Sequence, residues 1–160
     1  TLMSSLRVDA ANVQHIPLKV GGRFQRQRGY ALGQVRRPGY PWVSFVSIHL
    51  GLEAAERARH AAALMKALTG DGPLVVAGDL NEGPDGQAWM TVGRRLRVVT
   101  GEAPTFPATN PHRRPDAIFA SPTLPAVPTV PISLDPADLA SATDHLPVWV
   151  DLDLTGLANG

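Results

Sequence analysis

The nine residues Pro73-Leu74-Val75-Val76-Ala77-Gly78-Asp79-Leu80-Asn81 hold the pattern that decides the fold of this chain. The stretch opens with five consecutive apolar residues, a run typical of a strand that is buried on both faces of a sheet. A glycine interrupts the run, and an acid and an amide follow it two residues apart. We therefore predict a central strand that ends at a polar site.

The segments on either side predict an α/β (α+β) architecture. Residues 53–68 carry apolar side chains at the i, i+4, i+7 spacing of an amphipathic helix, and Gly70 follows as a stop signal. His60 is expected on the exposed side of this helix. A second, weaker helix is expected over 89–96. Strands are expected at 11–18, 29–36, 42–50, 73–77, 117–120, 127–134 and 147–154, the first two joined by a turn at Gly21-Gly22.

Length and composition limit the class of protein. The chain has 160 residues, enough for one hydrophobic core and too few for two domains of ordinary size. It contains no cysteine, which excludes disulfides, thiolate zinc sites and cysteine nucleophiles. No stretch approaches the ~20 apolar residues of a membrane-spanning helix. The sequence predicts one folded domain, or part of one, without a membrane span.

The net charge of +1 hides an asymmetry between the two parts of the chain. Residues 1–50 hold seven Lys or Arg residues and one acid, a balance of +6, so the remainder carries −5. A basic region of this kind can contact phosphate groups, and it can equally be a solvated surface. A small β-rich module that binds nucleic acid through this region is therefore one open alternative.

Polar side chains stand at the ends of several predicted strands. Asp79 and Asn81 follow the central strand, and an extended backbone would point both to the same side. A carboxylate there can orient water, and an amide can donate to an anionic oxygen. The alternative is an Asx-turn that only ends the strand. His49 ends another strand, and Asp116 begins a third.

Two further groups extend this set. Asp144 and His145 precede the last predicted strand, where an acid and an imidazole can serve as metal ligand and general base; a plain turn is the alternative. Arg113 and Arg114 stand beside the acid of the third strand and are candidates for contacting a substrate phosphate. Strand ends that all carry such groups predict one composite site.

Four ordered motifs resemble the second half of the endonuclease/exonuclease/phosphatase superfamily, which includes DNase I-like nucleases, abasic-site endonucleases, neutral sphingomyelinases and inositol-polyphosphate phosphatases. The motifs are Ser47-Ile48-His49-Leu50, Val76-Ala77-Gly78-Asp79-Leu80-Asn81, Arg114-Pro115-Asp116-Ala117-Ile118-Phe119 and Thr143-Asp144-His145-Leu146-Pro147-Val148. The resemblance implies a DNase I-like four-layer α/β-sandwich, of which residues 1–160 represent the C-terminal part. It also implies a Mg²⁺- or Mn²⁺-dependent phosphoesterase of nuclease or phosphodiesterase type.

The resemblance assigns roles residue by residue. It implies that Asp79 orients the attacking water, that Asn81 holds the phosphoryl group and can join Asp144 at the metal, and that His145 contacts the phosphate or acts as base. Asp116 would orient a catalytic imidazole, and His49 matches a histidine of the DNase I and sphingomyelinase branches.

The chain departs from the family pattern in two places. Pro115 stands where the family has isoleucine, and the metal-binding glutamate of the family's N-terminal half has no counterpart. We therefore expect the isolated chain to be nearly inactive and to need the missing half for a complete site. A lipid or inositol phosphate phosphoesterase, and a truncated member that only binds a partner, are the remaining alternatives.

Overall fold

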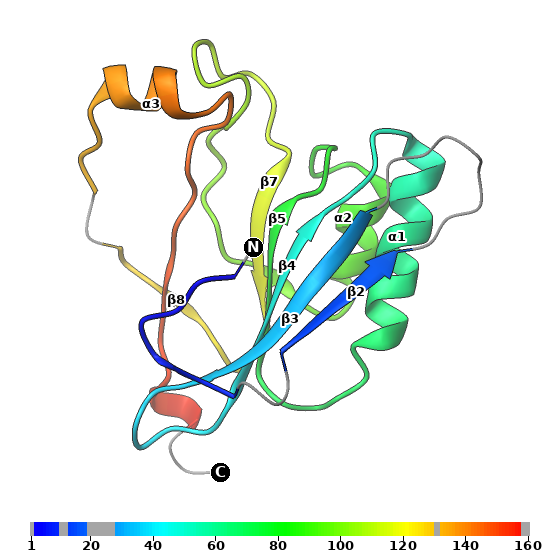
Figure 1. The fold of residues 1–160 in the computed structure, drawn as a ribbon, viewed down its shortest axis with the longest axis vertical. Helices are drawn as coiled ribbons and strands as arrows, with labels where there is room; N and C mark the ends of the chain where they lie inside the picture. Colours follow the sequence, from blue (N-terminus) through cyan, green and yellow to red (C-terminus); the bar gives the residue numbers. More distant parts are fainter. Residues whose placement is uncertain (1, 10–12, 19–27, 130–131, 158–160) are drawn as a thin grey trace.

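A seven-stranded sheet forms the centre of the molecule (Figure 1). The computed structural model describes residues 2–9, 13–18, 28–129 and 132–157. The sheet order is β1-β3-β4-β5-β7-β6, and β2 pairs with a different part of β3. The strands are β1 (Arg7–Val8), β2 (Gln14–Leu18), β3 (Arg28–Arg36), β4 (Val43–His49), β5 (Leu74–Asp79), β6 (Arg97–Val98) and β7 (Asp116–Ala120).

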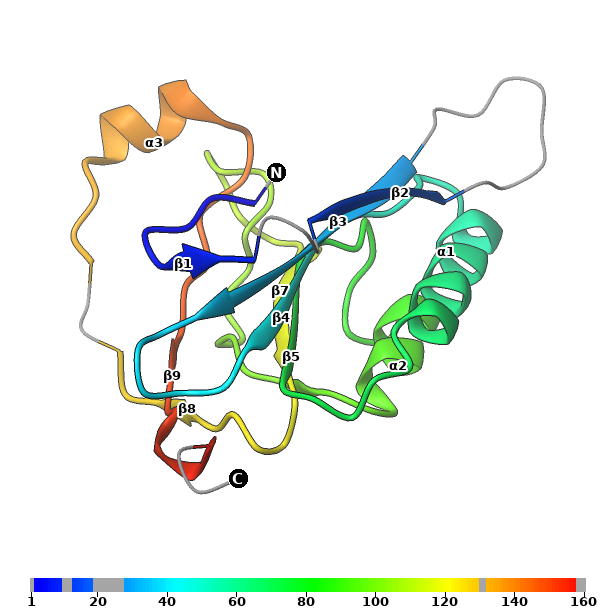
Figure 2. The same ribbon diagram turned by 60° about the horizontal axis from the view of Figure 1, so that its bottom comes forward.

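One parallel pair lies at the middle of this otherwise antiparallel sheet. β4 and β5 run in the same direction, so the chain must cross back between them, and α1 (Ala54–Ala67) makes that crossover. The shorter α2 (Gln87–Gly93) follows β5. Figures 1 and 2 show both helices on the same face of the sheet.

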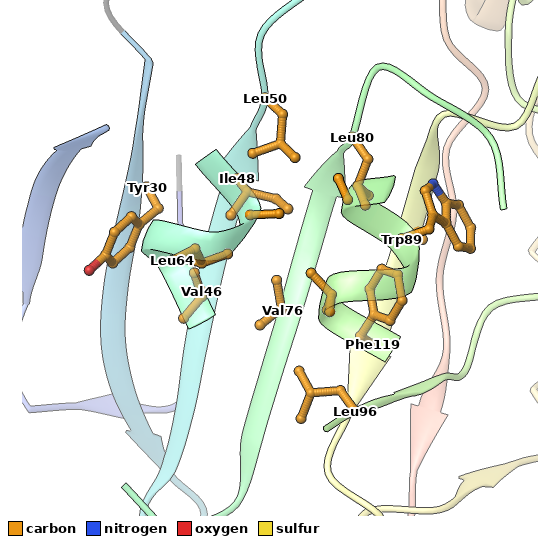
Figure 3. Close-up of a cluster of buried hydrophobic side chains, with 14 of the residues drawn as sticks. Tyr30, Val46, Ile48, Leu50, Leu64, Val76, Leu80, Trp89, Leu96 and Phe119 are labelled. Carbon is orange, nitrogen blue, oxygen red and sulfur yellow. The ribbon is translucent and has the colours of Figure 1, made fainter. Parts of the chain in front are cut away.

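Apolar side chains fill the space between these helices and the sheet (Figure 3). Val76 of β5 and Phe119 of β7 are fully buried there, and the Phe119 ring meets Trp89 edge-on at 5.3 Å. The next residue along β5, Val75, belongs to a second buried cluster with Leu124 and Leu157. β5 is therefore buried on both faces, as its continuous apolar run predicts.

The second cluster lies on the face of the sheet that α1 and α2 do not cover. The chain beyond β7 passes along this side in both views, with α3 (Pro136–Ala142), the two-residue strands β8 (Ala126–Val127) and β9 (Asp151–Leu152), and a 3₁₀ turn (Thr155–Leu157). β8 and β9 pair only with each other among the described strands. This C-terminal arm, residues 121–157, thus has far less regular structure than the sheet.

The strands expected within the sheet are present, although β1 and β6 were not predicted, whereas the predictions fail in the arm. The strand expected over 127–134 is wrong, because among the described residues of that range only Val127 is in a strand, and Pro128 has no N–H for a ladder. The strand over 147–154 is reduced to β9, and α3 was not predicted, although Asp135 caps it through a bond from Ala137 N at 2.8 Å. Residues 11–12 and the Gly21-Gly22 turn lie outside the described residues.

Helix α1 has the expected period but presents a different face. Its buried residues are Glu56, His60, Ala61 and Leu64, and His60 is only 1% exposed, so the surface position expected for His60 is wrong. Within the described parts of the chain, no helix has both the length and the apolar character to cross a membrane. The mixed α+β class itself is confirmed.

Candidate active site

Three polar residues lie side by side where three neighbouring strands of the sheet, β4, β5 and β7, meet one end of it. The strand register pairs His49 of β4 with Asp79 of β5, and Asp79 with Asp116 of β7. Because neighbouring strands are about 4.8 Å apart, register alone brings these three side chains to one end of the sheet. The predicted convergence of His49, Asp79 and Asp116 is therefore built from the sheet itself.

Gly78 allows β5 to pair closely with β4 immediately before Asp79. Its φ of +146° is a conformation that residues with a side chain rarely adopt. A Cβ at this position would lie 2.0 Å from the carbonyl oxygen of Ile48 on β4. The sequence therefore needs glycine beside the acid, which accounts for one residue of the Gly-Asp-x-Asn motif.

Asp79 and Asn81 come together through a turn. Asn81 has a φ of +56°, its backbone N donates to Asp79 Oδ1 at 2.7 Å, and its side-chain amide donates to the Leu50 carbonyl oxygen at 2.8 Å. The extended backbone expected between the two residues is wrong, because this Asx-turn replaces it. Both side chains nevertheless line the same pocket.

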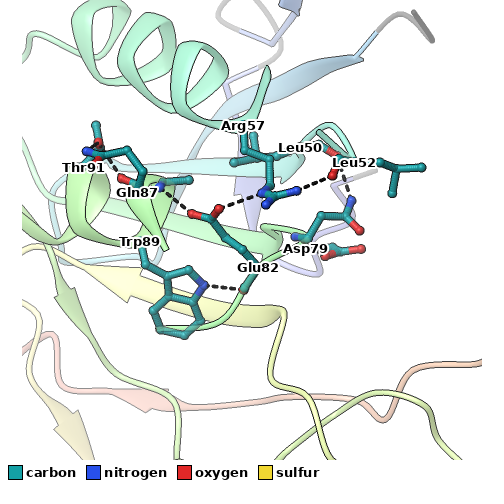
Figure 4. Close-up of polar contacts among 10 residues, drawn as sticks. Leu50, Leu52, Arg57, Asp79, Glu82, Gln87, Trp89 and Thr91 are labelled. Carbon is teal, nitrogen blue, oxygen red and sulfur yellow. Dashed lines mark hydrogen bonds and ion pairs between the residues drawn. The ribbon is translucent and has the colours of Figure 1, made fainter. Parts of the chain in front are cut away.

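Glu82 anchors the loop that carries this turn (Figure 4). Its Oε2 accepts from Arg57 Nε of α1 at 2.7 Å, and its Oε1 accepts from the backbone N of Ala88 at 2.5 Å. The backbone carbonyl of Glu82 accepts from Trp89 Nε1 at 2.8 Å. A carboxylate that is 10% exposed thus fixes the loop to both helices, a positioning role that the sequence did not reveal.

His145 reaches the same end of the sheet from the C-terminal arm. Its Nδ1 lies 2.8 Å from Asp116 Oδ2, and the hydroxyl of Thr105 donates to that same oxygen at 2.5 Å. Thr105 is only 3% exposed, and the ring of Phe106 lies 4.8 Å from the imidazole. The expectation that Asp116 orients an imidazole thus has a matching contact in the structure.

The backbone around Thr105 holds the segment on both sides of His145. The Thr105 carbonyl accepts from Leu146 N at 2.7 Å, and Ala108 N donates to the Asp144 carbonyl at 2.7 Å. These bonds attach the arm to the loop that precedes β7. Thr105 and Phe106 were missed because their partners are distant in sequence and they belong to no local pattern.

The contacts of His145 change its proton affinity. Partial burial is the largest single influence and lowers the pKa, but the hydrogen bond and charge of Asp116, with the charges of Asp79 and Asp144, outweigh it. The pKa of His145 is therefore raised above its usual value. This imidazole holds a proton more readily than a free histidine does.

The pKa of His49 shifts in the opposite direction, below its usual value. Burial and the nearby Arg28 guanidinium lower its pKa, and the Asp79 charge does not fully compensate. Its Nε2 lies 3.5 Å from Asp79 Oδ2. Two histidines whose pKa values move apart beside shared carboxylates are suited to opposite proton-transfer roles.

These groups line one cavity of about 550 Å³, here called the strand-end pocket. Among the described residues, Asp79, Asp116 and His145 each offer one ligand atom within 4.8 Å of the others, a spacing that can hold a metal ion. The pocket is lined by Arg28, His49, Leu52, Asp79, Asn81, Phe106, Arg113, Pro115, Asp116, Asp144 and His145.

The two arginines predicted to contact phosphate, Arg113 and Arg114, lie in different surroundings. Arg113 lines the strand-end pocket, with its guanidinium 5.5 Å from the Phe106 ring centre. Arg114 does not line it, and instead donates to the Thr100 carbonyl at 3.2 Å and lies over the Trp89 ring. Arg28 also lines the pocket, although it was not among the predicted site residues. The available signal was its place in the basic N-terminal region, directly before an expected strand.

Comparison with solved structures identifies the fold. The chain aligns over 95% of its length with an endonuclease/exonuclease/phosphatase protein of Beutenbergia cavernae, covering 46% of that protein at 24% identity and a TM-score of 0.77. A mannosyl-6-phosphatase of Bacteroides thetaiotaomicron matches over 91% of this chain and 67% of its own, at 18% identity and a TM-score of 0.69. The human Nocturnin catalytic domain matches over 93% and 61%, at 18% identity and a TM-score of 0.69.

The likeness rests on structure, since the sequence matches no protein-family model and no curated protein. At these identities it establishes the fold. The chain spans about half to two-thirds of the structures it matches, which is consistent with the predicted C-terminal portion. The chain therefore has the DNase I-like fold of the endonuclease/exonuclease/phosphatase proteins and accounts for part of their length.

Proposed function

We propose that residues 1–160 form the C-terminal part of a divalent-metal-dependent hydrolase of phosphoester bonds. The observation that carries this proposal is the convergence of Asp79, Asp116 and His145, with ligand atoms within 4.8 Å of one another, in a pocket that also holds Asn81 and Arg113. Water attack on phosphorus requires a positioned water, donors for the phosphoryl oxygens and a charge that offsets the developing negative charge. This pocket has a group for each requirement.

The described contacts suggest how the chain's own residues divide the work. His145 bonds to Asp116 through Nδ1, which leaves Nε2 as the ring atom that can meet water or substrate. Asp116 and the Thr105 hydroxyl act as positioning groups for that ring. Asp79 accepts from Asn81 N through Oδ1, so its Oδ2 is the oxygen placed to orient water or join a metal. Arg113 is assigned to the phosphoryl oxygens.

The residues present fit a divalent cation in part. Carboxylate oxygens suit Mg²⁺ and Mn²⁺, and the imidazole favours the transition metal of the two. Asn81 and Asp144, which line the same pocket, are proposed as further oxygen ligands. A bound cation would supply charge stabilisation for the phosphoryl group.

The structural neighbours have different descriptions, so the substrate class of this chain is part of the proposal. The structural neighbours include a protein described as a mannosyl-6-phosphatase and others described only by the endonuclease/exonuclease/phosphatase family. A nuclease or phosphodiesterase is our first choice, because Arg28 and Arg113 add positive charge at the pocket. A lipid or inositol phosphate phosphoesterase is the alternative, and a non-catalytic member that binds a partner is a third.

The test compares three substrates in two proteins. Plasmid DNA, sphingomyelin and an inositol polyphosphate are incubated with Mg²⁺ or Mn²⁺ and either this chain or the longest polypeptide its gene encodes. We expect metal-dependent turnover by a polypeptide that completes the domain, nearly none by residues 1–160 alone, and a loss of about 10²-fold or more in Asp79→Ala. Turnover that survives Asp79→Ala or chelation would reject the proposal.

A further inference from the structure

A second pocket adjoins the strand-end pocket and shares two residues with it. Arg113 and Pro115 line both cavities. The second, here called the arginine pocket, has a volume of about 580 Å³ and is also lined by Arg114, His112 and Glu102. A molecule bound at the strand-end pocket can therefore extend past Arg113 into a second hollow.

The Arg114 side chain of the arginine pocket is held in place by two kinds of contact. The Arg114 guanidinium is held between the Thr100 carbonyl, which accepts its hydrogen bond, and the ring of Trp89, 5.0 Å away. Guanidinium has five donors, so the contacts of its Nη2 with the Thr100 carbonyl at 3.2 Å and the Thr100 hydroxyl at 3.5 Å leave donors for an anion. Arginine held in this way loses less side-chain freedom when it binds phosphate. Arg113 stands at the boundary, over Phe106.

The acids of this pocket do not cancel its positive character. Glu82 is already bonded to Arg57 at 2.7 Å and to the backbone of α2, so its charge is offset within the loop. Glu102 is exposed at the rim, where solvent screens its charge. Arg113 and Arg114 thus line a pocket whose two acids are a screened carboxylate and one that already has a partner.

We propose that the arginine pocket binds a second phosphate group of the same substrate molecule. This inference rests on the proposed phosphoester chemistry, because it requires the first phosphate to occupy the strand-end pocket. The substrate class then narrows to compounds that carry at least two phosphates, such as a nucleotide chain or a bisphosphorylated sugar. Isolated monophosphates would fill only one of the two pockets.

The test measures binding and needs no turnover. Residues 1–160 are titrated, with Mg²⁺ present, with adenosine 5′-monophosphate, adenosine 3′,5′-bisphosphate and inositol 1,4-bisphosphate, while calorimetry gives affinity and NMR follows the histidine rings. His145 reports the strand-end pocket and His112 reports the arginine pocket. We expect a bisphosphate to bind about tenfold more tightly than the monophosphate and to shift both rings. The better of the two bisphosphates identifies the source of the second phosphate.

Three variants separate the pockets. Arg114→Met keeps a side chain that can pack on Trp89 but removes the charge, and it should reduce bisphosphate affinity about tenfold while monophosphate affinity stays within about twofold. Glu102→Gln should increase bisphosphate affinity by about twofold at most, because solvent already screens this charge, and damage to the fold cannot imitate a gain. Arg94→Ala, on the exposed end of α2, is the matched control and should change neither.

The possible results separate the second phosphate site from the proposed phosphoester hydrolysis on which it rests. If both bisphosphates bind no more tightly than the monophosphate, or if Arg114→Met weakens all ligands equally, the second site is rejected while a His145 shift still supports the first. If no ligand shifts His145, the proposed function fails, and the second site fails with it.

Discussion

The two regions that form the candidate site are built in different ways. His49, Asp79 and Asp116 stand on β4, β5 and β7, strands held in one continuous ladder and covered by two buried clusters. His145 comes from the C-terminal arm, where the described strands are two residues long and α3 is largely exposed. The sheet thus positions His49, Asp79 and Asp116, whereas hydrogen bonds from the loop before β7 position His145.

The largest expected effect comes from removing packing in each region in turn. Phe119→Ala removes a fully buried ring from β7 and should lower the free energy of unfolding by about 3–5 kcal/mol. Trp149→Ala removes a side chain of the arm that is 39% exposed and should cost less than half as much. Urea unfolding measures both, and equal costs would contradict the difference between the regions.

A backbone change at the strand end should be nearly as damaging. Gly78→Ala forces a Cβ against the Ile48 carbonyl and strains a positive φ, so we expect a loss of about 2–4 kcal/mol. Gly93→Ala is the matched control: this helical glycine has open space around it, and alanine there should be neutral or stabilising by about 0.5–1 kcal/mol. Equal midpoints for the two variants in urea would show that the close approach of β4 and β5 is unimportant.

The contact between Asp116 of the sheet and His145 of the arm predicts how the pKa of His145 responds to mutation. Asp116→Asn removes the charge that most supports protonated His145, so the pKa of His145 should fall, while Asp138→Asn on the surface of α3 should leave it unchanged. Ring NMR signals measured against pH give both values. An unchanged pKa in Asp116→Asn would mean that the bond between the two residues does not persist in solution.

The same link predicts a small pH dependence of stability. Because folding raises the pKa of His145, its contribution is fully present below the unfolded pKa of about 6.5 and is lost as pH rises through the folded value. His145→Gln should therefore destabilise the chain more at pH 5.5 than at pH 8.5. Thermal unfolding at the two pH values tests the sign, and a larger loss at high pH would contradict it.

The sequence predicts the part of the site that the sheet builds better than the part that the C-terminal arm and the loop before β7 supply. The run before Asp79 is a local pattern, and burial on both faces follows from it, so β5 and its polar end were predictable. Thr105 lies 11 residues from Asp116, and its hydroxyl meets the carboxylate only after the loop before β7 folds back. Local patterns cannot reveal such a partner. The segment 127–134 contains two prolines, which lack the N–H that a strand ladder needs, so a local signal against the expected strand was present in the sequence.

We propose that the strand-end pocket, with Asp79, Asp116 and His145 at its centre, binds a divalent cation, and Mn²⁺ binding measures this property of the pocket. The five histidines of the chain provide separate ring signals, and a bound paramagnetic ion broadens those nearest to it. We predict that substoichiometric Mn²⁺ broadens His145 and His49 first, that Asp79→Asn removes this preference, and that Asp138→Asn preserves it. Equal broadening of all accessible histidines, or a preference that survives Asp79→Asn, would show that the strand-end pocket does not bind the ion.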